Sequence, residues 1–336
     1  MAVVIPEFEN QDYEVLCAVR GCTRDGIRKL ENKGKCRFCD ETACDFFRKK
    51  SHTFPEGLGN KWITSADECD KCNALFGIYD DALCKSVGPL LTIERVKGKG
   101  GKIRQTGRSE GSHNFKYETS DGKSSIKTEL MNKSKNIEIP EGTSITFIVD
   151  PDSSFDGAII KRIPVPAEKF VPRYAYKCLV KMGFALIPHG ELNNFTKLKK
   201  WLQAPDDNCD FPFLDVGIST GSLSDPPEVL AAVILRRRQG AIVSPEYIFW
   251  FCAGSICWQI ELRSDSSDAN LPPVKFGLIN FDWIMCQQDD DTRTFNRFTT
   301  PHHFDWKSGV AEPIPISAIC HIHSPTEGNS FEVDWL

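Results

Sequence analysis

Four cysteines in two Cys-x-x-Cys pairs are the residues of this sequence whose spacing most directly suggests chemistry. They are Cys36 and Cys39, followed by Cys69 and Cys72, with 29 residues between the pairs. Two such pairs supply the four thiolates of a tetrahedral structural zinc site and leave no open position for a reaction. A redox dithiol would need only one pair. We therefore expect a Zn²⁺ ion that holds the fold and takes no part in catalysis.

A single histidine, His52, lies near the middle of the segment between the two pairs. It stands in FFRKKSHTFPEGLGN, where an apolar pair precedes it and a turn rich in proline and glycine follows. The pattern predicts a strand that ends at His52, then a loop, then a helix that starts near Cys72. Such a unit would bring His52 close to Asn73. Taken alone, His52 would be a hydrogen-bonded structural histidine and Asn73 a capping residue.

The motif CRFC…SHTFPEGLGN…ECDKCN…FG resembles the HNH endonuclease family, the ββα-metal nucleases, in the branch that two zinc-binding Cys-x-x-Cys pairs hold together. The likeness covers roughly Cys36 to Leu83. It implies that His52 is the general base and that Asn73 is a ligand of one catalytic Mg²⁺ or Mn²⁺ ion. A neutral imidazole suits the first task and a carbonyl oxygen the second. Gly77, one turn beyond Asn73, would leave room for a phosphate.

The sequence departs from the family pattern at two positions. Ser51 stands where the family has a metal-binding carboxylate, and the hydroxyl is a poor substitute. We expect another acidic residue to supply the charge, and the spacing does not choose among Glu56, Asp45 and Asp70. The family's middle asparagine, which fixes the loop that holds the histidine, falls at Thr64 by its offset from Cys69 or at Asn60 nearby.

Hydrophobic periodicity predicts the elements that must position these residues. A helical period runs from Cys72 to Leu83, and two further helical stripes between residues 166 and 203 predict a pair of helices. We expect a short helix around residues 12–30. Residues 113–130 read as a hairpin and residues 136–150 as two more strands. The segments VLAAVILRRR, EYIFWFCAG, ICWQIELRS and VKFGLINFDWIM read as later strands, with Trp250, Trp258 and Trp283 in their core.

These elements predict an α+β protein. We divide it into a zinc-stapled ββα-metal nuclease module over residues 1–90, a basic β-rich region over residues 91–150 and a mixed α/β domain over residues 151–336. The last domain, rich in strands with some helices, is expected to have a recognition or regulatory role.

A local excess of positive charge lies just after the module, although the whole chain has a net charge of −5. Residues 95–108 contain six basic residues and no acidic one. Such a segment suits a polyanion, since every neutralised phosphate releases a counterion, and a solvated basic loop is the competing reading. The candidate nucleic-acid contacts are Arg95, Lys97, Lys99, Lys102, Arg104 and Arg108.

Other features of the sequence indicate the cellular compartment and the state of the remaining cysteines and histidines. The N-terminus does not resemble a signal peptide and no apolar run is long enough to span a membrane, so we expect a protein of the reducing cytoplasm. The other ten of the 14 cysteines are expected to be mainly buried thiols. The histidines of PHH (His302, His303) and CHIH (His321, His323) lack a second pair at zinc spacing, and we expect no metal there.

Three hypotheses for function follow. The first is a metal-dependent HNH endonuclease that hydrolyses DNA phosphodiester bonds, by family analogy in bacterial defence against foreign DNA. The second is a zinc-stabilised nucleic-acid-binding protein without catalysis, for which Ser51 is the main argument. The third is an effector nuclease that a small molecule or protein activates through the C-terminal domain.

Overall fold

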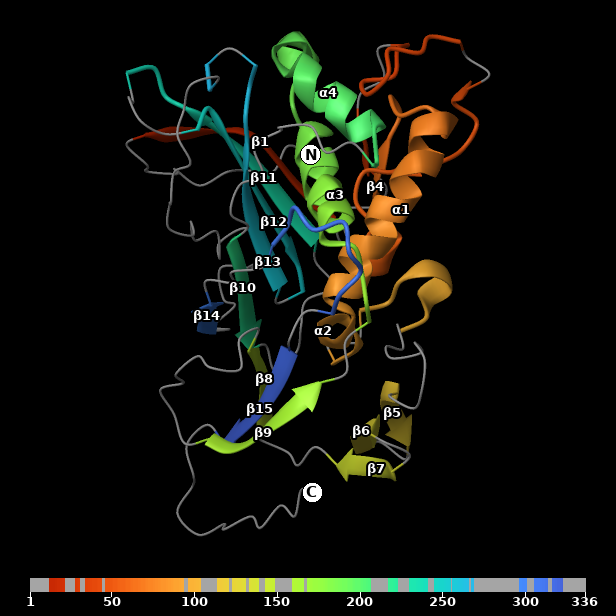
Figure 1. Cartoon of the computed structure of the whole chain (residues 1–336), viewed down its shortest axis with the longest axis vertical. Coiled ribbons are helices and arrows are strands. Elements are labelled where there is room, and N and C mark those ends of the chain that lie inside the picture. Colours follow the sequence, from red (N-terminus) through yellow and green to blue (C-terminus); the bar gives the residue numbers. More distant parts are fainter. Residues whose placement is uncertain are drawn as a thin grey trace.

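The computed structural model confirms an α+β architecture (Figure 1). The structure describes the following residues: 12–21, 28–30, 34–43, 46–93, 96–103, 114–120, 123–130, 133–138, 143–148, 159–165, 168–206, 217–222, 230–240, 245–254, 256–265, 267–268, 296–300, 305–313 and 316–322. The predicted strand at VKFGLINFDWIM, with Trp283, lies outside these ranges, as do His302, His303 and His323.

A six-stranded antiparallel sheet is the largest element of the fold, with strand order β1-β11-β12-β13-β10-β14. Its strands are β1 (Tyr13–Gly21), β10 (Gly217–Ser222), β11 (Leu230–Arg237), β12 (Tyr247–Ala253), β13 (Ile256–Leu262) and β14 (Asn296–Thr300). Every residue of β12 and β13 is buried, as the continuous apolar runs predict. Trp250 and Trp258 are core residues, as predicted.

The N-terminal strand corrects one prediction. Residues 13–21 form β1 rather than the expected helix, and they pair with β11 from Tyr13 opposite Arg237 to Gly21 opposite Leu230. The partner strand lies more than 200 positions away, so no local period can reveal the pairing. Tertiary context overrides a weak local propensity here. The first strand of residues 1–90 therefore belongs to the same sheet as the strands of the C-terminal region.

Helices cover one face of this sheet (Figure 1). They are α1 (Asp70–Ser86), α3 (Pro172–Phe184) and α4 (Thr196–Gln203), with the short helix α2 (Gly88–Ile93) after α1 and the 3-10 helix η4 (His189–Phe195) before α4. The predicted helices in 72–83 and 166–203 are thus confirmed. Gly183 allows α3 to approach the sheet closely, because a Cβ there would lie 2.7 Å from a Leu262 methyl and 2.8 Å from the Phe249 ring.

A second, small sheet with strand order β2-β4-β3 lies beside α1. It consists of β2 (Arg28–Lys29), β3 (Ser51–His52) and β4 (Ile63–Ser65), and the 3-10 helix η2 (Glu56–Leu58) follows β3. We call β3, η2, β4 and α1 the ββα unit. Its strand ends at His52 and its helix begins at Asp70, two residues before the predicted start. One hydrophobic core runs from this unit through α3 to the six-stranded sheet.

Two three-stranded sheets complete the described fold, with orders β5-β6-β7 and β8-β15-β9. Their strands are β5 (Asn114–Ser120), β6 (Lys123–Leu130), β7 (Lys133–Glu138), β8 (Thr143–Ile148), β9 (Ile159–Val165) and β15 (Ile316–Ile322). The hairpin predicted over residues 113–130 is confirmed by β5 and β6. The strands predicted on either side of Pro140 are present as β7 and β8, but each pairs with a different neighbour.

Candidate metal centre and adjoining histidine

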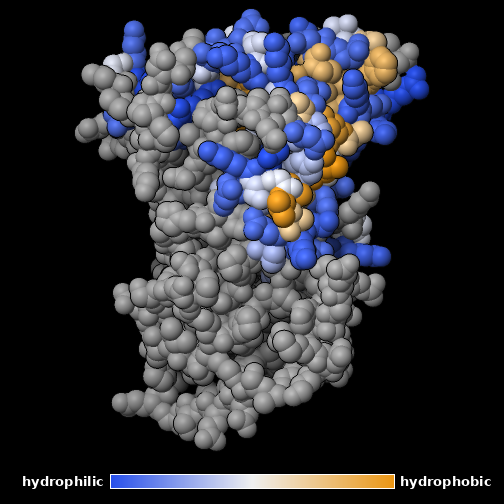
Figure 2. Space-filling view, viewed as in Figure 1, coloured by the Kyte–Doolittle hydropathy of each residue, from blue (hydrophilic) through white to orange (hydrophobic). Residues whose placement is uncertain are grey.

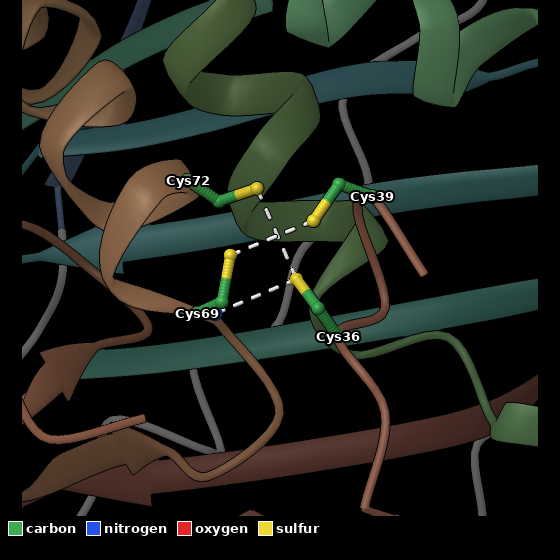
Figure 3. A group of neighbouring side chains, drawn as sticks. All are labelled: Cys36, Cys39, Cys69 and Cys72. Atoms are coloured by element: carbon green, nitrogen blue, oxygen red, sulfur yellow. Dashed lines mark hydrogen bonds between the residues drawn. The ribbon is translucent and has the colours of Figure 1, made fainter. Parts of the chain in front are cut away.

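The four predicted zinc ligands converge at the start of α1 (Figure 3). The Sγ atoms of Cys36 and Cys72 lie 3.8 Å apart, and those of Cys39 and Cys69 lie 3.5 Å apart. All four sulfur atoms are within 4.8 Å of one another. Tetrahedral coordination with Zn–S bonds of about 2.3 Å would separate the sulfurs by roughly 3.8 Å. The cluster therefore has the donor set and the dimensions of a structural metal site.

Hydrogen bonds and burial shift the pKa values of the cluster cysteines in different directions. The hydrogen bond between Cys36 and Cys72 lowers the pKa of Cys36 to about 5, and burial raises the pKa of Cys39 to about 11. The same hydrogen bond, together with burial, raises the pKa of Cys72. The backbone N–H of Cys69 donates to Cys36 Sγ at 3.4 Å, and Gln203 Nε2 donates to Cys72 Sγ at 3.2 Å. Outer donors of this kind orient metal-bound thiolates and stabilise their charge.

Arg37 fixes the first Cys-x-x-Cys pair to the rest of the fold. Its buried guanidinium forms an ion pair with Asp67 at 2.7 Å and donates to the carbonyls of Phe184 at 2.9 Å and Ile187 at 3.1 Å. His189 Nε2 lies 2.9 Å from the same carboxylate oxygen of Asp67. Through Arg37, the cysteine cluster is connected both to the loop before α1 and to the segment that follows α3.

His52 lies at the end of β3, opposite Thr64 of β4, and its side chain is 17% exposed. Its Nε2 atom is 3.6 Å from a carboxylate oxygen of Glu56, while its Nδ1 atom is buried and makes no hydrogen bond to a described residue. Burial lowers the pKa of His52, and the nearby Lys50 and Lys181 act in the same direction, whereas Glu56 and Asp80 oppose them. The imidazole is therefore predominantly neutral at pH 7.

The loop that follows His52 is organised by Asn60, one of the two predicted candidates for that task. The buried Nδ2 of Asn60 donates to the carbonyls of Phe54 and Ile63, both at 2.8 Å. Its Oδ1 accepts from the backbone N–H of Ile63 at 2.9 Å and from that of Trp62 at 3.3 Å. Thr64, the other candidate, is a buried strand residue opposite His52.

Ser51 points away from the surface on which His52 is exposed. It is fully buried, and its Oγ donates to the backbone carbonyl of Glu68 at 3.4 Å. Of the acids considered as replacements, Glu56 is the one beside His52. Asp70 accepts a hydrogen bond from the backbone of Lys49 at 2.9 Å, and Asp45 lies outside the described residues.

Asn73 is half-buried on α1, on the same stripe as the exposed Gly77 and the half-buried Asp80. Its side chain makes no hydrogen bond to another described residue, and no described contact joins it to His52. Within the described ranges, the four cysteines are the only His, Cys, Asp or Glu group of three or more whose donor atoms lie close enough together to hold a metal. No second group of this kind is present in that part of the chain.

The structure adds two charged residues to the surroundings of His52 that the sequence did not single out as functional. Lys181 of α3 donates to the backbone carbonyl of His52 at 3.3 Å and pairs with Asp80 at 3.4 Å. Asp80 lies on the helical stripe of Asn73, so the period could have drawn attention to it. Lys181 lies 129 positions from His52, and nothing in its local sequence indicates this contact.

Part of the basic segment packs beside the turn that carries Glu56. A β-bridge joins Lys97 to Ile103, and the 3-10 helix η3 (Lys99–Gly101) lies between them. Gly98 fits against this turn, because a Cβ there would lie 3.4 Å from the Glu56 carbonyl oxygen and 3.4 Å from the Cα of Gly57. Lys97 and Lys102 are exposed. The other predicted contacts, Arg95, Arg104, Arg108 and the side chain of Lys99, lie outside what the structure describes.

The surface around α1 is mainly hydrophilic, with a few hydrophobic side chains gathered among the charged ones (Figure 2). No helix of the described residues is long and apolar enough to cross a membrane. None of the protein families, curated proteins or solved structures with which the chain was compared matches it.

Proposed function

We propose that this chain is a metal-dependent endonuclease that hydrolyses phosphodiester bonds of DNA, as its resemblance to the HNH family implies. The single observation that carries the proposal is the placement of His52. It lies at the end of a strand in a ββα unit, partly exposed, with a lowered pKa and a carboxylate 3.6 Å from its Nε2 atom. A neutral imidazole held in this way suits general-base catalysis near neutral pH.

In the proposed reaction His52 accepts a proton from the water that attacks the phosphorus. Glu56 faces the imidazole and stabilises the imidazolium that forms. A Mg²⁺ or Mn²⁺ ion, when bound, would polarise the phosphate and stabilise the leaving oxygen. Magnesium sites in such enzymes use one or two carboxylates and complete their shell with water and phosphate oxygens. Glu56, the acid beside His52, and the side-chain carbonyl of Asn73, the ligand that the family resemblance implies, would be the protein ligands of such an ion.

The basic segment supports a nucleic acid as the substrate. Its exposed Lys97 and Lys102 belong to a loop that packs on the Glu56 turn, next to His52. A phosphodiester backbone that crossed this loop would come close to the imidazole. Because each neutralised phosphate releases a counterion, the affinity for DNA should fall steeply as the salt concentration rises.

Plasmid cleavage with Mg²⁺ or Mn²⁺ tests the proposal, with the variant His52→Ala against the wild type. Loss of a general base lowers the rate by about 10²–10⁴-fold. The matched control is Lys49→Ala, which alters an exposed residue near β3 whose charge is not among those named above as acting on the pKa of His52, and it should retain cleavage. A wild-type protein that cuts neither DNA nor RNA with any divalent ion, or a His52→Ala protein that cuts at the wild-type rate, would refute the proposed role.

A nucleic-acid-binding protein without catalysis is the second candidate. Two observations favour it. Ser51 is buried where the family has a metal-binding carboxylate, and the described residues hold no second group of three or more His, Cys, Asp or Glu close enough together to bind a metal. Fluorescence anisotropy with labelled DNA separates the candidates. Binding that persists in a wild-type protein with no cleavage under any ion supports this one.

An effector nuclease that is activated through the C-terminal region is a refinement of the first candidate. The contact between Lys181 of α3 and His52 favours it, since a partner or small molecule bound to that region would act on the candidate catalytic strand through α3. Cleavage that begins only when an activator is added would distinguish this form. A role in bacterial defence against foreign DNA would suit such control.

A further inference from the structure

A lysine from the C-terminal half of the chain lies buried beneath the candidate catalytic strand. Lys181 of α3 has a side chain only 1% exposed, and its Nζ atom lies 3.3 Å from the backbone carbonyl oxygen of His52 and 3.4 Å from Asp80 Oδ1. The ammonium group also lies 5.9 Å from the ring centre of Phe76. One side chain therefore joins β3, α1 and α3.

The surroundings keep this ammonium group in one place. A buried charge persists when it is paired and hydrogen-bonded, and Asp80 provides the pairing. The carboxylate is itself held, because Cys178 Sγ donates to Asp80 Oδ1 at 3.3 Å. The buried carboxyl group of Glu68 also stabilises the charged ammonium group electrostatically. Lys181 therefore directs another of its three N–H groups at the His52 carbonyl from a fixed position.

Strand β3 needs such support because it is short. It contains two residues, Ser51 and His52, which pair with Ser65 and Thr64 of β4. A two-residue strand gains few ladder hydrogen bonds, so its end is free to move unless another contact holds it. The bond from Lys181 falls on the residue whose side chain is the candidate base.

We propose that Lys181 is a positioning residue for His52, which fixes the carbonyl group of His52 and thereby the direction of its imidazole. The inference rests on the proposed function for its catalytic consequence, whereas the contact itself can be tested without activity. It follows that the C-terminal half controls the candidate site through α3, since a shift of that helix would release the end of β3.

The test compares two lysines of the same helix in the full-length protein. Lys181→Met removes the ammonium group at the contact and keeps much of the length of the side chain. Lys177→Met is the matched control, because Lys177 is also fully buried on α3 but donates to the carbonyls of Trp201 and Ala204 at the end of α4. Both variants remove one buried charge from neighbouring turns of one helix.

Nuclear magnetic resonance of protein with labelled histidines reads the contact directly, with His52→Gln used for assignment. Lys181→Met should shift the carbonyl ¹³C signal and the ring ¹⁵N signals of His52, and Lys177→Met should leave them in place. In the cleavage assay, a misplaced base should lower kcat by about 10²-fold while KM changes little. The zinc content should match the wild type in both variants.

His52 signals in Lys181→Met that coincide with those of the wild type would overturn the proposal, whatever the activity. If these signals shift but the wild-type protein never cuts nucleic acid, the proposed function fails and the positioning contact stands. Lys181→Gln is the second variant if Lys181→Met does not fold. It replaces the ammonium group by a shorter neutral amide, and an unchanged His52 carbonyl signal in it would also refute the proposal.

Discussion

Charges of both signs meet around the imidazole of His52. Burial and the ammonium groups of Lys50 and Lys181 lower its pKa, whereas the carboxylates of Glu56 and Asp80 raise it. The resulting pKa of His52 lies below the ordinary value of 6.5. Neutral His52 therefore contributes fold stability that is complete above pH 6.5 and is lost as the pH falls through the folded-state pKa. Catalysis by the neutral form should decline over the same window.

Removing the charge of Glu56 and removing the charge of Lys50 should shift the pKa of His52 in opposite directions. Glu56→Gln removes a charge that favours the imidazolium, so the pKa of His52 should fall further. Lys50→Gln removes a charge that disfavours the imidazolium, so the pKa should rise. Titration of the His52 ring signals by nuclear magnetic resonance measures both shifts. Shifts of the same sign in the two variants would contradict the electrostatic account.

Replacing Asn60 should mainly reduce the stability of the fold, whereas replacing Asn73 should mainly reduce cleavage. Asn60→Ala leaves buried backbone groups around the Phe54–Ile63 loop without partners, and each costs about 1–3 kcal/mol, so we expect a loss of roughly 2–4 kcal/mol. Asn73→Ala should cost less than about 1 kcal/mol, because its side chain makes no described hydrogen bond. It should instead reduce cleavage. Urea unfolding measures the first effect, and equal losses for both variants would contradict this division.

At the scale of elements, the cysteine cluster determines where α1 begins. Cys69 is the residue before the helix and has no side-chain capping bond, and Cys72 lies in its first turn. A bound metal would link this turn to the loop of Cys36 and Cys39, which replaces the stabilisation that an ordinary cap provides.

Replacing one cysteine of the cluster should therefore release the metal and loosen the whole ββα unit. We expect about one zinc ion per chain in the wild type and none in Cys36→Ser or Cys72→Ser, with a clear fall in Tm. Cys17→Ser on β1 is the control and should keep its zinc. Elemental analysis and thermal unfolding measure these outcomes, and a Cys72→Ser protein that retains stoichiometric zinc would disprove the four-cysteine site.

At the scale of the whole molecule, the ββα unit depends on the C-terminal half. Its helix packs on α3, Tyr79 donates to the carbonyl of Leu202 at 2.9 Å, and Arg37 donates to the carbonyls of Phe184 and Ile187. The N-terminal strand β1 pairs only with β11 in the six-stranded sheet. These contacts bury one side of the unit under residues far along the chain.

A fragment of residues 1–103 should therefore fail to fold independently, even with zinc. It would expose the buried face of α1, including Phe76 and Tyr79, and leave β1 without its neighbour. Circular dichroism should show a low helix content and no cooperative unfolding transition. A fragment that unfolds cooperatively and cuts DNA would show that the candidate site does not need α3.

The sequence alone determined the features that depend on neighbouring residues. The spacing of Cys36, Cys39, Cys69 and Cys72 identified the candidate metal ligands, and hydrophobic periods located α1, α3 and the strands β11 to β13. Such patterns are readable because helix and strand periods and zinc-ligand spacing are local properties of the chain.

Only the tertiary structure decided which distant residues meet. In the folded chain β1 pairs with β11, and Asn60 rather than Thr64 fixes the loop after His52. The side chain of Ser51 is buried, and Lys181 contacts the backbone of His52. The pairing of β1 and the Lys181 contact span more than a hundred positions, whereas the roles of Asn60 and Ser51 depend on their burial. Such contacts become favourable only in the assembled core, so they produce no periodic pattern of residue types in the sequence.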